Sequence, residues 1–316
     1  MPTFVDHAPR TLVLGSTGFI GSRVAALLAG SGRTQVIALS RKPDDRLQKY
    51  NAITAAADIS VQGSLLPFLA EADVVVHAAS YVGSDAGRAR ETNETGTANV
   101  VEQCRDSGAR LIYVSTCSVY GTGPHRGLRE GGVEYRPASA ASASRRRAEE
   151  MVLDYGGEVV RPNLVFGEGD RWLIPGILKM LDAAGGWPGD GSALLSVISV
   201  ESLGKLIAGL ALGARQAGQS FHAAFPDPVP VSLLLNTVVH AFGRDPVEFL
   251  GDDPAAARAL EHAGFSRHQI DLVTSDHWYS SKRIWRLAGI KPESPSEALS
   301  GLAASYSASN RGAKGM

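Results

Sequence analysis

A glycine-rich segment near the beginning of the chain carries the residue types that bind a phosphate group. It follows a short apolar run and consists of Gly15, Ser16, Thr17, Gly18, Phe19, Ile20 and Gly21. Glycines at this spacing allow a tight turn and a close approach of the backbone to a pyrophosphate, and the N-terminus of a following helix adds N–H donors. A strand is expected before the segment and a helix after it, so the pattern predicts a dinucleotide site. The alternative is a structural turn in another α/β protein.

Basic residues at the end of the second apolar run bear on the kind of dinucleotide. An NAD site usually has Asp or Glu at this point, bonded to the ribose 2′-hydroxyl, whereas Ser40, Arg41 and Lys42 stand here. A guanidinium can bind a 2′-phosphate in a fork, so we expect NADPH or NADP in preference to NADH. The alternative is a solvated basic pair on a loop. Further adenosine contacts, or else simple packing, are expected from Asp58, Ile59, Ala78, Ala79 and Ser80.

Apolar runs of strand length alternate with helical patterns through the first half of the chain. The six expected strands cover 11–15, 34–40, 53–58, 72–80, 109–116 and 158–163, and the clearest helices between them cover 19–29 and 88–107. This alternation implies a parallel, doubly wound α/β sheet of the Rossmann type, with ligand at the carboxyl ends of the strands. We therefore expect residues 1–165 to form an NADP-binding domain.

Beyond residue 166 the pattern becomes looser, which indicates a smaller and mostly helical lobe. The expected elements are a helix and a Gly/Pro/Trp loop at 172–191, a strand and helix at 196–212, and helices near 231–243, 254–264 and 296–305. We expect 166–305 to bind the substrate, with some segments returning to the first domain. Residues 306–316 are expected to form a disordered tail.

The composition argues against several classes of partner. The chain has 316 residues, of which 20% are charged, and a formal net charge of −1, so its bulk charge favours neither nucleic acid nor an anionic membrane. Cys104 and Cys117 lack metal-like spacing, so we expect reduced thiols and no metal. No apolar leader and no run of 18 apolar residues is present. We expect a cytoplasmic protein without a membrane span, either a monomer or a homodimer.

Six motifs occur in the order typical of one enzyme family. They are GSTGFIG, HAAS, TNETGTANVV at 92–101, YVSTCSVYG at 113–121, VVRPNLVFGEGD at 159–170 and SVISVESLG at 196–204. On these motifs the chain resembles the extended short-chain dehydrogenase/reductase family. The resemblance implies that Thr116 donates to a substrate carbonyl, unless it only satisfies the backbone at the strand end. It also implies cofactor contacts from Asn93, Ser115, Pro162, Asn163 and Val165.

One motif of that family is missing. The family's acid is the tyrosine of YxxxK, and the fragment that fits the pattern places Ala141 at the tyrosine and Arg145 at the lysine, one helical turn apart. None of the eight tyrosines is followed by lysine four residues later, so the pair is absent rather than moved. Arginine stays charged and cannot be the acid, although Arg145 could hold a ribose hydroxyl or a developing oxyanion. The alternative is a solvated helix face with Arg145–Glu149 and Arg146–Glu150 pairs.

The missing acid leaves four explanations open. A phenol of the substrate, held beside the carbonyl, could supply the proton. An ordered water held by Thr116 and Ser118 could act, or the protein could bind NADP(H) without turning it over. In the remaining explanation another side chain donates the proton. The candidates are Tyr81, Tyr120, Tyr135, His125, Ser118 and Thr116, although a role in packing or in a loop is the simpler interpretation for each of them.

The small Ala141 leaves room for a broad, flat substrate. Its expected lining is Tyr81, Tyr120, Trp172 and Trp187, the alternative for the tryptophans being core or loop anchoring. Together with GTGPHRG at 121–127, RPNLVFGEGDRW at 161–172 and the GGWPGDG loop, this departure resembles actinobacterial ketoreductases that act on angucyclinone-like aromatic polyketides in antibiotic biosynthesis. The resemblance implies NAD(P)H-dependent reduction of a ring ketone, with a substrate proton in place of the tyrosine's. The alternatives are an NDP-4-keto-6-deoxyhexose 4-ketoreductase and a non-catalytic NADP(H)-binding protein.

Overall fold

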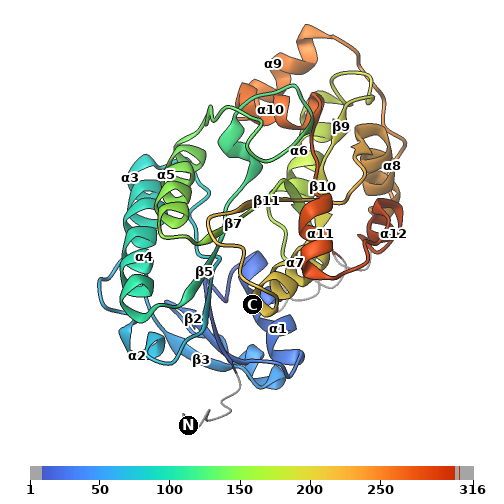
Figure 1. Ribbon diagram of the computed structural model, residues 1–316. Coiled ribbons are helices and arrows are strands. Elements are labelled where there is room, and N and C mark those ends of the chain that lie inside the picture. The colour runs from blue at the N-terminus through green and yellow to red at the C-terminus, as the bar shows by residue number, and fades with distance from the viewer. Residues whose placement is uncertain (1–8, 303–305, 307–316) are drawn as a thin grey trace, which may run out of the picture.

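The computed structural model describes residues 9–302 and residue 306, and its centre is a seven-stranded sheet (Figure 1). The strand order is β11-β7-β5-β4-β1-β2-β3, and all neighbouring strands are parallel. The strands are β1 (Arg10–Leu14), β2 (Gln35–Ser40), β3 (Ile53–Ala56), β4 (Val74–His77), β5 (Arg110–Val114), β7 (Glu158–Pro162) and β11 (Ser220–Ala223). The predicted doubly wound sheet and its six strands are confirmed. The seventh strand is not predicted, because the sequence SFHA contains no apolar run.

Side chains of the central strands alternate between two apolar layers, one on each face of the sheet. Val13 packs in the layer covered by α1 and α7, and its neighbour Leu12 packs in the layer covered by α4 and α5. The covering helices are α1 (Phe19–Gly30), α7 (Val200–Leu212), α4 (Gly96–Ser107) and α5 (Ala140–Asp154). Strands buried on both faces read as continuous apolar runs, which explains why the sequence predicts them well.

The long helix predicted between β4 and β5 is present and contains a π turn. It consists of α3 (Ala86–Ala89), the π segment η2 (Arg90–Thr95) and α4, which continue without a break. Such turns insert an extra residue in a helix and are frequent at functional sites. This one contains the fully buried Asn93.

The second lobe surrounds a small sheet of very short strands (Figure 1). That sheet has the order β12-β9-β13-β6, and a two-stranded pair joins β8 to β10. The strands are β6 (His125–Leu128), β8 (Leu164–Phe166), β9 (Leu194–Leu195), β10 (Val197–Ser199), β12 (Val229–Pro230) and β13 (His277–Tyr279). The helices are α6 (Leu173–Ala184), α8 (Val231–Ala241), α9 (Pro254–His262), α10 (Arg267–Thr274), α11 (Lys282–Ala288) and α12 (Pro295–Ser300). Most of these strands, together with α10 and α11, are too short for a sequence pattern to reveal.

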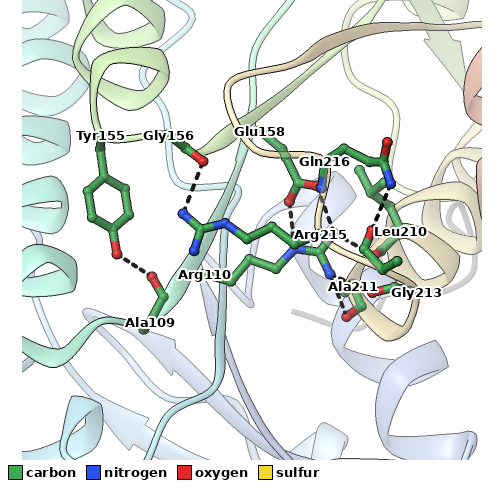
Figure 2. A network of polar contacts seen from close by, with 11 residues as sticks. Ala109, Arg110, Tyr155, Gly156, Glu158, Leu210, Ala211, Gly213, Arg215 and Gln216 are labelled. Atoms are coloured by element: carbon green, nitrogen blue, oxygen red, sulfur yellow. Dashed lines mark hydrogen bonds and ion pairs between the residues drawn. The ribbon is translucent and has the colours of Figure 1, made fainter.

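A buried ion pair closes the amino edge of the large sheet (Figure 2). Arg110 Nε and Nη2 donate to the two Glu158 carboxylate oxygens at 2.6 and 2.8 Å. The other guanidinium contacts reach the carbonyl oxygens of Leu210, Ala211 and Gly213 at the C-terminal end of α7. The pair therefore joins β5 and β7 to carbonyl oxygens that follow Arg110 by 100 to 103 residues in the chain.

At the other end of the chain, Tyr306 contacts the loop before α6. Its hydroxyl donates to Asp170 Oδ2 at 2.7 Å and accepts from the Gly167 N–H at 3.2 Å. The rest of the predicted tail, 307–316, lies outside the described residues. Across the described part of the chain, no helix has both the length and the apolar character that crossing a bilayer requires.

Candidate active site

The glycine-rich loop joins β1 to α1 and lies against the segment that follows β4. Gly15 has φ +78°, and its N–H donates to Leu39 O at 3.0 Å. A Cβ at Gly15 would lie 2.6 Å from the Ala79 nitrogen, and a Cβ at Gly21 would lie 2.2 Å from Gly15 O. The N-cap residue of α1 is Gly18, which has no side chain that could cap the helix. The loop requires glycine at both positions and presents an uncapped helix N-terminus, which fits a dinucleotide pyrophosphate.

The residues predicted to contact the adenosine lie beyond the ends of β2 and β3. The Ser40 hydroxyl donates to Lys42 O at 2.7 Å, and Arg41 and Lys42 are exposed. The Ser60 N–H donates to Asp58 at 3.0 Å and is the main reason that the pKa of Asp58 is lowered. The positive charge of Arg41 lowers the same pKa further. Arg41 and Asp58 therefore influence each other at the carboxyl edge of the sheet.

Asn93 joins the segment after β4 to α5. Its Oδ1 accepts from the Tyr81 N–H at 2.8 Å, and its Nδ2 donates to Tyr81 O and to Ser144 Oγ, both at 2.9 Å. Ala78, Ala79 and Ser80 directly precede Tyr81 and are half-buried. Asn93 therefore holds the predicted ribose-binding segment against the helix that carries Ala141 and Arg145.

Two hydroxyl groups meet where β5 ends and the short turn η3 (Cys117–Tyr120) begins. Thr116 Oγ1 accepts from the Ser118 N–H at 3.1 Å and donates to Ser118 Oγ at 3.2 Å. Both residues are half-buried. Because Thr116 donates to Ser118, the Ser118 hydroxyl proton is the one left to be donated to a ligand.

Helix α5 begins with a capping box formed by Ser139 and Ser142 and extends toward β5. Ala141 lies in its first turn and Arg145 one turn further, both half-buried. Arg145 Nη2 donates to Val114 O at 3.2 Å and to Ser115 O at 2.9 Å. The guanidinium therefore points from the helix to the last residues of β5, next to the Thr116–Ser118 pair.

Of the two ion pairs considered for α5, Arg146–Glu150 forms and Arg145–Glu149 does not. Arg146 does pair with Glu150 at 3.0 Å, but Glu149 is bound by Arg161 of β7 instead of by Arg145. The reason is geometric: Glu149 is fully buried on the face of α5 that packs on the sheet, where Arg161 Nε and Nη2 reach its two oxygens at 2.9 and 2.8 Å. Sequence reasoning missed Arg161, although a charged residue inside the apolar run EVVRP is a signal of a buried partner.

Tyr120 does not line an open site, which corrects the sequence expectation. It is 2% exposed; Arg161 Nη1 donates to its hydroxyl at 2.8 Å, and His222 Nε2 lies 2.7 Å from the same oxygen. Burial raises its pKa far above the ordinary range. His125 is also buried, is bonded to the Tyr279 hydroxyl at 2.8 Å, and has a pKa lowered to about 4 by burial. Neither Tyr120 nor His125 is placed to give a proton to a ligand.

The predicted aromatic lining is divided between core and surface. Trp187 is 1% exposed, belongs to the apolar core, and donates its backbone N–H to Glu248 O, so it anchors the loop and corrects the expectation of a lid. Trp172 is 65% exposed at the N-terminus of α6. Tyr81 is half-buried, and its ring lies beneath the Arg88 guanidinium. Trp172 and Tyr81 thus retain accessible aromatic surface.

The residues after β7 connect the two lobes. Asn163 Nδ2 donates to Ser196 O at 2.9 Å and to His277 O at 3.2 Å, so its amide is engaged by the small sheet. Pro162 is buried and Val165 is half-buried in β8. Two other residues expected to contact the cofactor, Ile59 and Ser115, are buried as well, which places them beneath the surface of the site.

Comparison with known proteins gives relatives that are named as reductases. The chain is 28% identical to the 2-alkyl-3-oxoalkanoate reductase of Stenotrophomonas maltophilia, over 95% of this chain and 100% of that protein. It is 28% identical to the dTDP-4-dehydrorhamnose reductase of Mycobacterium tuberculosis, over 90% of this chain and 89% of the relative. These names agree with the predicted oxidoreductase.

Solved structures share the fold across nearly the whole chain. The dTDP-glucose 4,6-dehydratase of Streptomyces venezuelae, solved with NAD, is 25% identical with a TM-score of 0.72, and the match covers 96% of this chain and 98% of that one. The dTDP-glucose 4,6-dehydratase of Bacillus anthracis, also with NAD, is 18% identical with a TM-score of 0.74 over 96% and 98%. Residues 11–207 match the NAD dependent epimerase/dehydratase family. The predicted extended short-chain type is thereby confirmed, and the chain is an oxidoreductase that belongs to the NAD dependent epimerase/dehydratase family.

Proposed function

We propose that the chain is an NADPH-dependent ketoreductase that reduces a ring carbonyl of an angucyclinone-like aromatic polyketide. The observation that carries the proposal is the arrangement at the end of β5, where the Thr116 and Ser118 hydroxyls contact each other and the Arg145 guanidinium donates to the neighbouring Ser115 carbonyl, while Ala141 stands in place of the family's tyrosine. The reductase names of the relatives support reduction of a carbonyl.

The residues proposed to hold the cofactor surround the glycine-rich loop. The α1 N-terminus would bind the pyrophosphate, and the exposed Arg41 and Lys42 would bind a 2′-phosphate. Replacing both with alanine should weaken NADPH binding far more than NADH binding. Equal losses for the two cofactors would contradict the NADP preference.

When bound, the nicotinamide supplies a hydride to the carbonyl carbon. The chain must then stabilise the oxygen on which negative charge develops. Ser118 donates its hydroxyl proton in a hydrogen bond to that oxygen, Thr116 orients Ser118, and Arg145 contributes a permanent positive charge beside them. General acid catalysis is worth about 10² to 10⁴ in rate, or roughly 3 to 5.5 kcal/mol, and Arg145 cannot supply a proton.

We propose that the proton comes from the substrate, from a phenol next to the reacting carbonyl, or from an ordered water. Ala141 takes little space and Trp172 presents an exposed indole, both of which suit a broad aromatic ligand. Methylation of the neighbouring phenol should abolish turnover if the substrate supplies the proton. Unchanged turnover would assign the proton to water.

Two other functions follow from particular observations. The similarity to dTDP-4-dehydrorhamnose reductase favours an NDP-4-keto-6-deoxyhexose 4-ketoreductase. The absence of the YxxxK pair favours a protein that binds NADP(H) without turnover.

One assay distinguishes the three candidate functions. Purified protein and NADPH are mixed with an angucyclinone ketone and, in a separate experiment, with a dTDP-4-keto-6-deoxyhexose. Oxidation of NADPH above the enzyme-free control with the first supports the proposal, and oxidation with the sugar alone replaces it. Tight binding without oxidation in either case identifies the binder.

A further inference from the structure

Four buried polar atoms lie beneath the carboxyl ends of β4 and β5 without a hydrogen-bond partner among the described residues. They are His77 Nδ1, the Tyr113 hydroxyl, Ser115 Oγ and Arg145 Nε. Buried polar groups are nearly always hydrogen-bonded, so four unpartnered atoms in one place call for an explanation. None of these side chains except Arg145 belongs to the proposed machinery for hydride transfer.

Ring, hydrogen-bond and electrostatic contacts bring His77, Tyr113 and Arg145 together between the sheet and helices α4 and α5. The His77 and Tyr113 ring centroids are 5.1 Å apart, and His77 Nε2 lies 3.1 Å from Thr97 Oγ1 in α4. Burial raises the pKa of Tyr113 to about 12; the Arg145 charge opposes that rise, as do the Arg145 and Thr97 side chains, which lie near the Tyr113 hydroxyl without meeting hydrogen-bond geometry. Burial, together with the positive charge of Arg145, lowers the pKa of His77 to about 3. The Arg145 cation therefore lies close to both rings.

The fourth residue, Ser115, adjoins the same guanidinium. Its carbonyl oxygen accepts from Arg145 Nη2 at 2.9 Å, and its side chain is fully buried. While Nη2 donates to the strand carbonyls, Nε has no hydrogen-bond partner in the part of the chain that the structure describes.

The hydrogen-bonding capacities of these atoms match water better than an ion. Arg145 Nε can only donate, the Tyr113 and Ser115 hydroxyls can donate and accept, and His77 Nδ1 does one or the other according to its tautomer. A water molecule can accept two hydrogen bonds, one of them from Nε, and donate two, which accommodates all four groups, whereas an anion would face a single cation and a metal ion would find no carboxylate among these four groups.

We propose that these atoms form a buried water site that fixes the Arg145 guanidinium against the end of β5, with Tyr113 as its positioning residue. The inference rests on the proposed function for the role of Arg145 toward the cofactor. Water held by Tyr113, Ser115 and His77 accepts a hydrogen bond from Arg145 Nε, while Nη2 donates to the carbonyl oxygens of the strand. Held in this way, the guanidinium directs its positive charge toward the site predicted for the nicotinamide ribose. The strand tyrosine thus orients a cation that replaces the family's lysine.

A double-mutant cycle of Tyr113→Phe and Arg145→Met tests the coupling through the dissociation constant for NADPH. We expect Tyr113→Phe to weaken binding about tenfold when Arg145 is present and to have no further effect when it is absent. Equal effects of Tyr113→Phe in both backgrounds would overturn the proposal.

Thermal stability gives a readout that does not depend on the cofactor. Removing an unsatisfied buried hydroxyl raises the melting temperature, whereas removing one bonded to water lowers it, so Tyr113→Phe should lower it. Tyr155→Phe is the matched control. Its hydroxyl contacts Ala109 O at 2.6 Å (Figure 2), so this variant should lose stability and keep its NADPH affinity.

A high-resolution crystal structure of the whole protein should show water within hydrogen-bond distance of Arg145 Nε, and a dry cluster would overturn the proposal. These measurements do not depend on turnover. A protein that shows the cycle and the water but reduces no ketone would lose the proposed function and keep this inference.

Discussion

Two buried arginine–glutamate pairs occupy opposite edges of the same sheet. Arg110 and Glu158 lie at the amino edge, and Arg161 and Glu149 lie at the carboxyl edge; in both pairs, Nε and Nη2 bind the two carboxylate oxygens. The remaining donors differ. Those of Arg110 reach backbone carbonyls at the end of α7, whereas those of Arg161 reach the side-chain hydroxyls of Tyr120, Tyr135 and Ser220.

The difference shows how one kind of interaction serves two purposes. At the amino edge it completes a helix terminus, which affects stability alone. At the carboxyl edge it connects α5 and the turn after Thr116, both of which carry candidate site residues, to the strand β11. In α/β sheets of this kind the carboxyl edge is where ligands bind.

The largest effect is expected from Arg161→Met. It leaves the Glu149 carboxylate buried and unpaired, so the free energy of unfolding should fall by about 3 to 5 kcal/mol. It also releases Tyr120 from α5, so kcat per folded molecule should fall about tenfold or more. Urea denaturation and the NADPH oxidation assay measure the two quantities. Combining Arg161→Met with Glu149→Leu should recover stability without recovering kcat, and a normal kcat in either variant would contradict a positioning role.

Arg110→Met should destabilise the protein by a similar amount, about 3 kcal/mol, because Glu158 is left buried without its partner. Its kcat per folded molecule should equal that of the wild type, since the Arg110 side chain bonds to Glu158 and to carbonyl oxygens at the end of α7, away from the candidate site. The same two assays apply. A selective loss of kcat would remove the proposed contrast between the edges.

Acid should weaken the carboxyl edge first. Burial lowers the pKa of His222 to about 3 and that of His125 to about 4, below the usual 6.5. Below pH 6.5 the unfolded chain therefore binds more protons than the folded one. The contribution of these two histidines to the free energy of unfolding is fully present above pH 6.5 and is lost as the pH falls toward 4. Each histidine contributes up to about 1.4 kcal/mol per pH unit. Denaturation at pH 7.5 and 5.5 should show the decline, and His222→Gln, whose amide oxygen can still accept from Tyr120, should make it shallower.

The smallest effect is expected from Arg215→Ala at the amino edge. Arg215 is exposed and donates to Gly156 O at 3.1 Å, beside the buried Arg110 pair (Figure 2). Because solvent replaces such a contact readily, stability should change by no more than about 0.5 kcal/mol. If Arg215→Ala lowered the free energy of unfolding as much as Arg110→Met, burial would not explain the expected difference between the two arginines.

Strong local patterns made most of the large sheet predictable. The run before Gly15 and the runs ending at His77 and Val114 are apolar on both faces, and the glycine spacing marks the turn that the added Cβ atoms confirm. The strand β11 and the small sheet were not predictable, because strands of two to four residues are defined by their neighbours rather than by their own pattern.

The candidate site divides in the same way. Glycine-rich geometry and the empty tyrosine position at Ala141 follow from residue types and spacing, because a short turn and one helical turn are local structures. The burial of Tyr120 and Trp187, the choice of Arg161 over Arg145 as the partner of Glu149, and the direction of the Arg145 side chain were decided only by the tertiary structure. Each depends on which distant strand supplies the opposing group, and the chain brings these groups together only when the sheet and its helices have packed.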